Sequence, residues 1–168
     1  QLTGLGIALG PGSFTGLRIG MALVKGLAQG LNIPIIGIPT LDFLAAAQPL
    51  LDVPLAAILH AGRGRLAVGW YKVGNGHWQS MENNQVMTVM ELAKKITKPS
   101  LIRGELTREE QKILARKYRN VTLSPPSRSI RRPSLLAELA FVRLQNNDLD
   151  DIKSLMPIYL HPGKEIEG

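Results

Sequence analysis

The first forty residues combine two short apolar runs with one long apolar periodicity. Residues 4–9 are apolar and bounded by glycine, and residues 33–38 form a second apolar run, which is typical of buried strands. From about residue 15 to residue 30, apolar side chains recur every three or four positions, which predicts a helix. Two strands joined by such a helix form a parallel pair. The apolar positions of the helix are Leu17, Met21, Val24, Leu27, Ala28 and Leu31.

Strand and helix patterns alternate through the rest of the chain. The sequences Thr-x-x-Glu at residues 88–91 and 107–110 match the capping box, in which threonine and glutamate bond free N–H groups at a helix start. Pro133 is well placed to begin an amphipathic helix that ends near Gln145. This alternation places the chain in the α/β class. Further strands are predicted at residues 55–59, 66–73, 100–103 and 121–123.

A boundary between two lobes is indicated soon after the second strand. Thr40 is placed to cap a short helix. Pro49 and Pro54 then bracket a segment in which proline disfavours regular structure. We expect one lobe in residues 1–52 and a second lobe in residues 53–168.

Composition narrows the chemistry. The 168 residues are 45% hydrophobic and 20% charged, as expected of a folded domain rather than a disordered chain. The sequence has no cysteine, which excludes disulfide scaffolds, cysteine zinc sites, iron–sulfur ligation and thiol nucleophiles. Charged residues and prolines interrupt the longest apolar region, so we expect no membrane span.

The positive charge is concentrated in one segment. The net charge is +7, and residues 103–132 hold nine basic against three acidic residues. One interpretation is a surface for RNA or another polyanion. The other is a solvated helix face with a basic loop, because Glu105, Glu109 and Glu110 are interspersed. The basic residues are Arg103, Arg108, Lys112, Arg116, Lys117, Arg119, Arg128, Arg131 and Arg132.

The most specific local motif is the turn from the first strand to the long helix, Gly10-Pro11-Gly12-Ser13-Phe14-Thr15-Gly16-Leu17-Arg18-Ile19-Gly20. Ser13 and Thr15 are candidate N-caps, beside N–H groups that are free to bind an anion. The motif is neither a P-loop nor Gly-x-Gly-x-x-Gly. Two interpretations stay open: an anion or nucleotide contact at Gly12 and Ser13, or a tight capped turn.

Glycines recur through the predicted helix. Gly16 and Gly20 are four residues apart, as are Gly26 and Gly30. A glycine in a helix interior costs about 1 kcal/mol relative to alanine, so close helix packing should compensate. The helix then packs closely either on its own sheet or on the equivalent helix of a partner.

The sequence from Gly10 to Gly20 resembles the signature of the TsaB family, also called YeaZ. The run at residues 33–38 and the Thr40-Leu41 start are similar to that family too. Pro157-Ile158-Tyr159-Leu160 resembles its carboxyl-terminal Pro-x-Tyr-Leu-Arg element, with His161 in place of the arginine. The resemblance is sharp over residues 4–45 and loose through the middle of the chain.

The resemblance implies an actin-like/Hsp70-like ATPase (ribonuclease H-like) fold of two lobes. It implies a non-catalytic scaffold or activator that pairs with the transferase TsaD and cooperates with TsaE in the cytoplasm. That complex forms threonylcarbamoyladenosine on the tRNA adenosine next to the anticodon. No cofactor is expected for this chain, with ATP possible in the complex, and a homodimer is possible in isolation. The interface residues carried over are Phe14, Thr15, Gly16, Leu17, Arg18, Gly20, Met21 and Ala22.

Besides His161, the chain departs from the family pattern in two places. The family's first strand, its Asp-Thr turn and the following hairpin and helix have no counterpart, so we expect an incomplete first lobe. The region His60-Ala61-Gly62-Arg63-Gly64-Arg65-Leu66-Ala67 lacks the acidic residues usual at the start of the second lobe.

No catalytic or metal-binding residue is predicted. His60, His77 and His161 lie far apart without metal-ligand spacing, and Ser13 has no neighbouring base. The acidic residues at 148, 150 and 151 are interpreted as a solvated helix end rather than a cation site. Two alternatives stay open: an ATP-dependent kinase-type fragment of the same fold, and a tRNA-binding module that uses residues 103–132.

Overall fold

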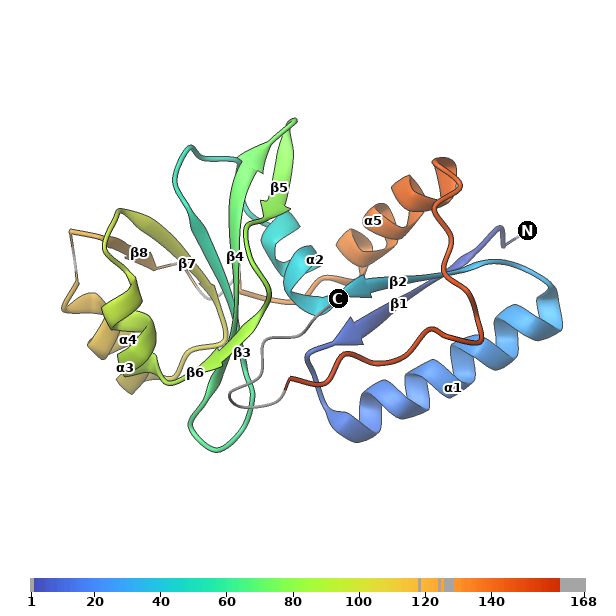
Figure 1. The fold of residues 1–168 in the computed structure, drawn as a ribbon, viewed down its shortest axis with the longest axis horizontal. Helices are drawn as coiled ribbons and strands as arrows, with labels where there is room; N and C mark the ends of the chain where they lie inside the picture. Colours follow the sequence, from blue (N-terminus) through green and yellow to red (C-terminus); the bar gives the residue numbers. More distant parts are fainter. Residues whose placement is uncertain (1, 118, 124, 126–128, 161–168) are drawn as a thin grey trace. The chain divides into compact units, whose positions relative to one another are not determined.

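The chain folds into two compact units (Figure 1). A computed structural model describes residues 2–117, 119–123, 125 and 129–160. The first unit combines Gln1–Phe43 with Arg132–Tyr159, and the second consists mainly of Leu44–Arg131. Each unit is described by itself below.

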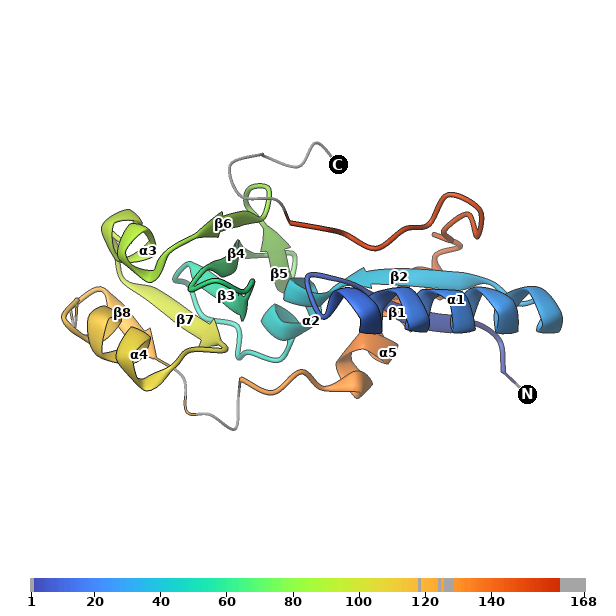
Figure 2. The ribbon, with the colours of Figure 1, turned by 90° about the horizontal axis from the view of Figure 1, so that it is seen from below.

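The first unit is a parallel strand pair with a helix on each face (Figures 1 and 2). Strand β1 (Leu5–Gly10) pairs in parallel with β2 (Ile35–Pro39), and α1 (Phe14–Leu31) connects them, as predicted. On one face, Ile7 and Ile35 pack against Met21 and Ala28 of α1. The opposite face packs on α5 (Pro133–Gln145), in a cluster of Ile36, Ile38, Phe43 and Ala140.

Helix α5 belongs to the first unit, which differs from the predicted division into residues 1–52 and 53–168. The reason is close packing between segments far apart in the sequence. A Cβ atom at Gly6 would lie 2.9 Å from the Cβ of Ala140, so glycine at this position lets α5 approach β1. The prediction that α5 is amphipathic is also wrong, because Phe141 and Val142 are both 56% exposed.

An arginine and two aspartates hold the outer edge of β2. Arg143 donates from Nη1 to the carbonyl oxygen of Gly37 at 2.8 Å, and Asp150 Oδ2 accepts from the Gly37 N–H at 2.7 Å. The N–H and the carbonyl group of Gly37 therefore both have a hydrogen-bond partner. Arg143 also donates to both carboxylate oxygens of Asp148, at 2.7 and 3.1 Å, and to Asp150 Oδ1 at 3.2 Å. We call Gly37, Arg143, Asp148 and Asp150 the edge clamp.

The second unit is a mixed sheet in the order β5-β4-β3-β7-β8, with β6 paired to β4. Strands β3, β7 and β8 are parallel, and β4 is antiparallel to β3. Both predicted capping boxes are present, at Thr88 with Glu91 and at Thr107 with Glu110. The elements are β3 (Leu55–His60), β4 (Leu66–Gly74), β5 (His77–Ser80), β6 (Gln85–Met87), α3 (Val89–Lys95), β7 (Ser100–Gly104), α4 (Arg108–Ala115) and β8 (Val121–Leu123); the short helix α2 (Thr40–Ala46) precedes them.

One face of this sheet carries α3 and α4. Leu92 of α3 and Leu114 of α4 are completely buried and share a core cluster with Ile58, Val68 and Ile102. The strands therefore give the two helices a fixed platform.

We predict that Arg143→Gln destabilises the chain by about 2 kcal/mol, because it leaves the Gly37 carbonyl and Asp150 without a charged donor. Hydrogen bonds from Arg143 lower the pKa of Asp148 below its ordinary value. A carboxylate with a lowered folded-state pKa stabilises the fold above its unfolded pKa, and this contribution disappears as the pH falls through the folded value. The stability difference between wild type and Arg143→Gln should therefore shrink below about pH 4, near the ordinary aspartate pKa. Urea unfolding between pH 7 and pH 2.5 measures it, and a pH-independent difference would contradict the role of Asp148.

Candidate functional site

The start of α1 is a capped turn. The Ser13 hydroxyl oxygen accepts from the Gly16 N–H at 3.3 Å, and the Leu17 N–H donates to the Ser13 carbonyl oxygen at 2.9 Å. Ser13 is therefore the N-cap, and Thr15 lies inside the helix. Helix capping alone explains the serine at position 13, and no ligand is needed to explain it. An anion contact at Gly12 and Ser13 stays a prediction.

Arg18 is held by two aromatic side chains of the first unit. Its guanidinium carbon lies 4.0 Å from the centre of the Phe14 ring, and its Nε donates to the Tyr159 hydroxyl at 3.0 Å. The Phe14 and Tyr159 rings are themselves 5.3 Å apart. The Ile158 N–H donates to the Leu9 carbonyl oxygen, which fixes this last segment beside β1. The structure thus brings together the motif at residues 10–20 and the segment at residues 157–160, which both resemble elements of the same family.

The predicted interface residues divide between two sides of α1. Met21 is 5% exposed and lies in the core with Ile7 and Ile35, so it is not available to a partner, which corrects its inclusion. Leu17 and Gly20 are half-buried, and a Cβ at Gly20 would lie 3.9 Å from Ile7. The remaining predicted residues are exposed, namely Phe14, Thr15, Gly16, Arg18 and Ala22.

The outer side of α1 is more apolar than the motif suggested. Ile19, Leu23, Leu27 and Leu31 follow one another at intervals of four residues, and each is between 45% and 63% exposed. Leu27 and Leu31 therefore belong to the solvent-facing side and not to the packed side. The four-residue spacing of these exposed side chains is present in the sequence. It overlaps with the spacing of the packed side chains, so the sequence alone does not separate the two rows. We call Ile19, Ala22, Leu23, Gly26, Leu27, Gly30 and Leu31 the open face of α1.

Two glycines on the open face are not required by packing inside the chain. A Cβ atom built at Gly26 or Gly30 would have no described atom within 4 Å, apart from its immediate surroundings in the helix. Both residues lie within the bounds of α1, where glycine is costly. The close packing that should offset the cost of these two glycines is therefore not found against this unit's own sheet. Their presence favours contact between α1 and another molecule.

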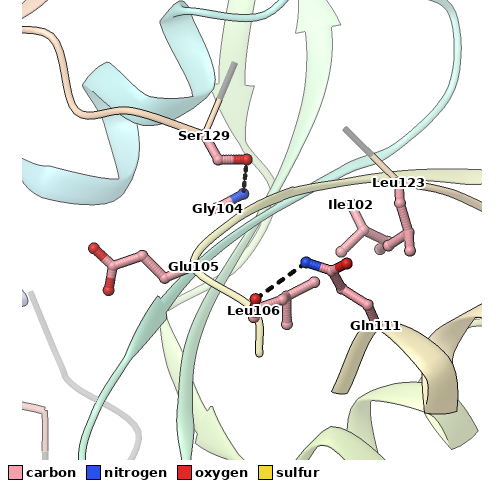
Figure 3. A pocket seen from close by; sticks show the side chains of 7 residues that line it. All are labelled: Ile102, Gly104, Glu105, Leu106, Gln111, Leu123 and Ser129. Atoms are coloured by element: carbon pink, nitrogen blue, oxygen red, sulfur yellow. Dashed lines mark hydrogen bonds between the residues drawn. The ribbon is translucent and has the colours of Figure 1, made fainter. Parts of the chain in front are cut away.

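A cavity of about 210 Å³ lies in the second unit, at the carboxyl end of β7 (Figure 3). Its polar groups are bonded to the protein itself. Gln111 Nε2 donates to the Leu106 carbonyl oxygen at 3.1 Å, and the Gly104 N–H donates to Ser129 Oγ at 3.4 Å. Glu105 forms an ion pair with Arg131 at 2.7 Å. These contacts stabilise the end of the strand, and we assign no ligand to the cavity.

Glycine is required at the rim of this cavity. Gly104 has a φ of +129°, a conformation that side-chain-bearing residues rarely adopt. A Cβ there would also overlap the carbonyl group of Ile58. The backbone conformation and the close approach of Ile58 therefore explain the glycine at position 104.

The basic segment does not form one continuous surface. Arg103 is 5% exposed, and its Nη1 donates to the carbonyl oxygens of Ile102 and Thr122, so it is not part of a polyanion site. Arg131 pairs with Glu105. Arg128, like His161, lies outside the described residues.

The titratable residues form ordinary structural pairs. His60 Nε2 lies 3.0 Å from Glu110 Oε2. Partial burial raises the pKa of Glu110, but hydrogen bonds from His60 and Thr107 outweigh it and hold the pKa below its usual value. Asp151 bonds the N–H groups of Lys153 and Ser154, as in a turn. Within the described ranges, no group of three or more histidine, aspartate and glutamate side chains could hold a metal ion. In the same ranges, no helix has the length and apolar character needed to cross a membrane.

The fold places the chain in the actin-like, ribonuclease H-like ATPase class. YeaZ from Pseudomonas aeruginosa aligns with a TM-score of 0.71 and 21% identity, covering 94% of this chain and 74% of that one. A second P. aeruginosa structure, described as similar to peptidase YeaZ, aligns with a TM-score of 0.74 at 21% identity, covering 95% of this chain and 74% of that one. Residues 1–149 match the family model "TsaD: tRNA N6-adenosine threonylcarbamoyltransferase".

Within that class, the chain belongs to the TsaB family. It is 31% identical over 164 residues to the tRNA threonylcarbamoyladenosine biosynthesis protein TsaB of Bacillus subtilis, covering 95% of this chain and 70% of that protein. TsaB of Escherichia coli is 35% identical over 90 residues, which are 52% of this chain and 39% of that protein. A Legionella pneumophila tRNA N6-adenosine threonylcarbamoyltransferase is 36% identical over 90 residues, 51% of this chain and 23% of that protein.

We predict that Gly26→Ala stabilises the isolated chain by about 0.5–1 kcal/mol, because alanine is the better helix former and its methyl group meets no atom. Gly6→Ala is the matched control, since its methyl group would collide with Ala140 and Leu136 of α5 and destabilise the chain. Chemical unfolding at low protein concentration measures both. A Gly26→Ala variant less stable than wild type would show that this side of α1 is packed in the free chain.

Proposed function

We propose that this chain is the non-catalytic partner of TsaD in the biosynthesis of threonylcarbamoyladenosine on the tRNA adenosine next to the anticodon. Its assignment to the TsaB family supports the pathway. The observation that carries the proposed role is the open face of α1. Four exposed aliphatic side chains and two unpacked glycines on one helix are a surface that gains stability when another helix covers it.

A helix is the partner element that this surface fits best. Glycine lets two helix backbones approach closely, while the aliphatic side chains at intervals of four residues form a ridge that fits a groove. A second copy of the chain presents the same surface, so we propose that a homodimer forms through it when TsaD is absent. TsaD then competes for the same face.

The proposal gives this chain no bond-breaking step. The Ser13 hydroxyl is used as a helix cap, and His60 pairs with Glu110. This bonding supports a scaffold better than a peptidase or a kinase. In this proposal TsaE, and ATP if the reaction needs it, bind to the assembled complex. No residue of this chain is assigned to either of them.

We predict that Leu23→Lys weakens the complex with TsaD from the same organism by at least tenfold, because it places a charge in the centre of an apolar contact. Met90→Lys is the matched control, since Met90 is 55% exposed on α3 of the second unit, where Leu23 is 61% exposed on α1. Isothermal titration calorimetry with purified TsaD gives both dissociation constants. Equal constants for the two variants would reject the open face as the docking site.

We also predict that Gly26→Leu weakens the same complex, while it leaves the fold of the free chain intact. A leucine side chain at this position has open space in the chain but would separate two closely packed helices. Circular dichroism checks the fold, and calorimetry checks the affinity. An unchanged dissociation constant in a folded variant would contradict close helix approach at Gly26.

A further inference from the structure

Two loops of the second unit meet at one end of the sheet. Helix α3 leads into the start of β7, and α4 leads into the start of β8. These strands are parallel, with Ser100 opposite Val121, so the carboxyl-terminal ends of both helices lie at the same edge. Asn120 joins the loops, since its Nδ2 donates to the Thr97 carbonyl oxygen at 3.2 Å and its own carbonyl accepts from the Ser100 N–H.

These loops gather cations that are separate in the sequence. The six cations, named below as the basic end, are all exposed. Lys95 is ion-paired, since its Nζ lies 2.6 Å from Glu82 Oε1. The acidic residues Glu109 and Glu110 lie in the first turn of α4, at its opposite end. Glu109 and Glu110 are therefore separated from the cations in space, whereas Glu82 lies beside Lys95. We call these cations the basic end, and they are Lys94, Lys95, Lys98, Arg116, Lys117 and Arg119.

Helix energetics explain only part of this arrangement. Cations in the last turn of a helix are stabilised by its dipole, which accounts for Lys94 and Lys95. Lys98, Lys117 and Arg119 lie beyond the helices, in the loops themselves. A concentration of like charge that the fold does not require favours an anionic partner.

A hollow of about 250 Å³ opens at the same end. Its walls include Pro54, Trp70, Met81 and Ile96, and Lys95 and Lys98 also line it. Trp70 is 8% exposed, and its indole nitrogen has no hydrogen-bond partner among the described residues. The hollow therefore combines apolar walls with neighbouring charged side chains, which include Glu82 beside the two lysines.

We propose that the basic end binds RNA, with backbone phosphates on the loop cations and one unstacked base in the hollow. Phosphate contacts supply affinity, and apolar walls beside cations suit the face of an unstacked base. An anionic membrane surface would engage the loop cations but would leave the hollow unused. This inference goes beyond the partner-docking role and uses none of the residues of the open face of α1.

The charge contribution is tested with Lys98→Gln/Arg116→Gln/Lys117→Gln in the full chain. The matched control is Arg63→Gln/Arg65→Gln/Arg108→Gln, which removes three exposed cations from the opposite end of the strands. Binding of an unmodified tRNA transcript is measured by fluorescence anisotropy from 50 to 300 mM KCl. The first variant should lower the slope of log K against log salt by about 2, and affinity near 0.1 M salt on the order of a hundredfold. Equal losses in both variants, or no binding by wild type, would overturn the proposal.

The hollow is tested with Trp78→Phe, which leaves Trp70 as the only tryptophan. The tRNA transcript should quench Trp70 fluorescence, whereas heparin, which has charge but no bases, should bind without quenching. Thr97→Trp, which fills the hollow from its exposed side, should weaken tRNA and not heparin binding. Identical behaviour of tRNA and heparin, or tighter binding to phosphatidylserine vesicles, would overturn the RNA assignment.

The two proposals fail separately. Leu23→Lys should lose TsaD and keep tRNA binding, while Lys98→Gln/Arg116→Gln/Lys117→Gln should keep TsaD and lose tRNA. The ligand that each variant still binds shows that the variant is folded. Loss of both ligands in either variant would contradict independent surfaces.

Discussion

The close approach of α5 to the parallel strand pair is the constraint on which the first unit depends. A parallel pair is stable only when both faces are covered. Gly6 allows Ala140 to reach β1, and Arg143 satisfies the edge of β2 at Gly37. With that face closed by α5, α1 covers the other face with Met21, Ala28 and the half-buried Val24, and leaves its opposite side to solvent.

Local patterns predicted the elements well and their assembly poorly. The capping boxes at Thr88 and Thr107 were identified correctly because both partners lie within four residues. The place of α5 in the first unit was missed because its contacts with β1 span more than a hundred residues. Arg103 was counted with the surface cations, although its guanidinium bonds the carbonyl of Thr122 on the neighbouring strand. Contacts between distant segments leave no periodic signal in the sequence.

The candidate surface on α1 was predicted in part. The glycine spacing indicated close packing, but two superposed periodicities hid which residues face outward. Leu17, Met21, Val24 and Ala28 form one row, while Ile19, Leu23, Leu27 and Leu31 form another. Only the position of β1 and β2 decides between them. The basic end was also predicted in part, because Arg116, Lys117 and Arg119 belong to the basic segment at residues 103–132. The lysines of the other loop were missed, because parallel pairing of β7 and β8 unites loops that are about twenty residues apart.

The discontinuity of the first unit has a consequence for folding during synthesis. Residues 44–131 are continuous, so the second unit can fold as soon as its strands leave the ribosome. The first unit cannot close until Arg132–Tyr159 has been made, although β1 and α1 are made before the second unit. Until then α1 is a nascent helix with apolar side chains on two sides. The order of completion along this chain is therefore the reverse of the order of translation, and the helix proposed to bind a partner is exposed longest to chaperones.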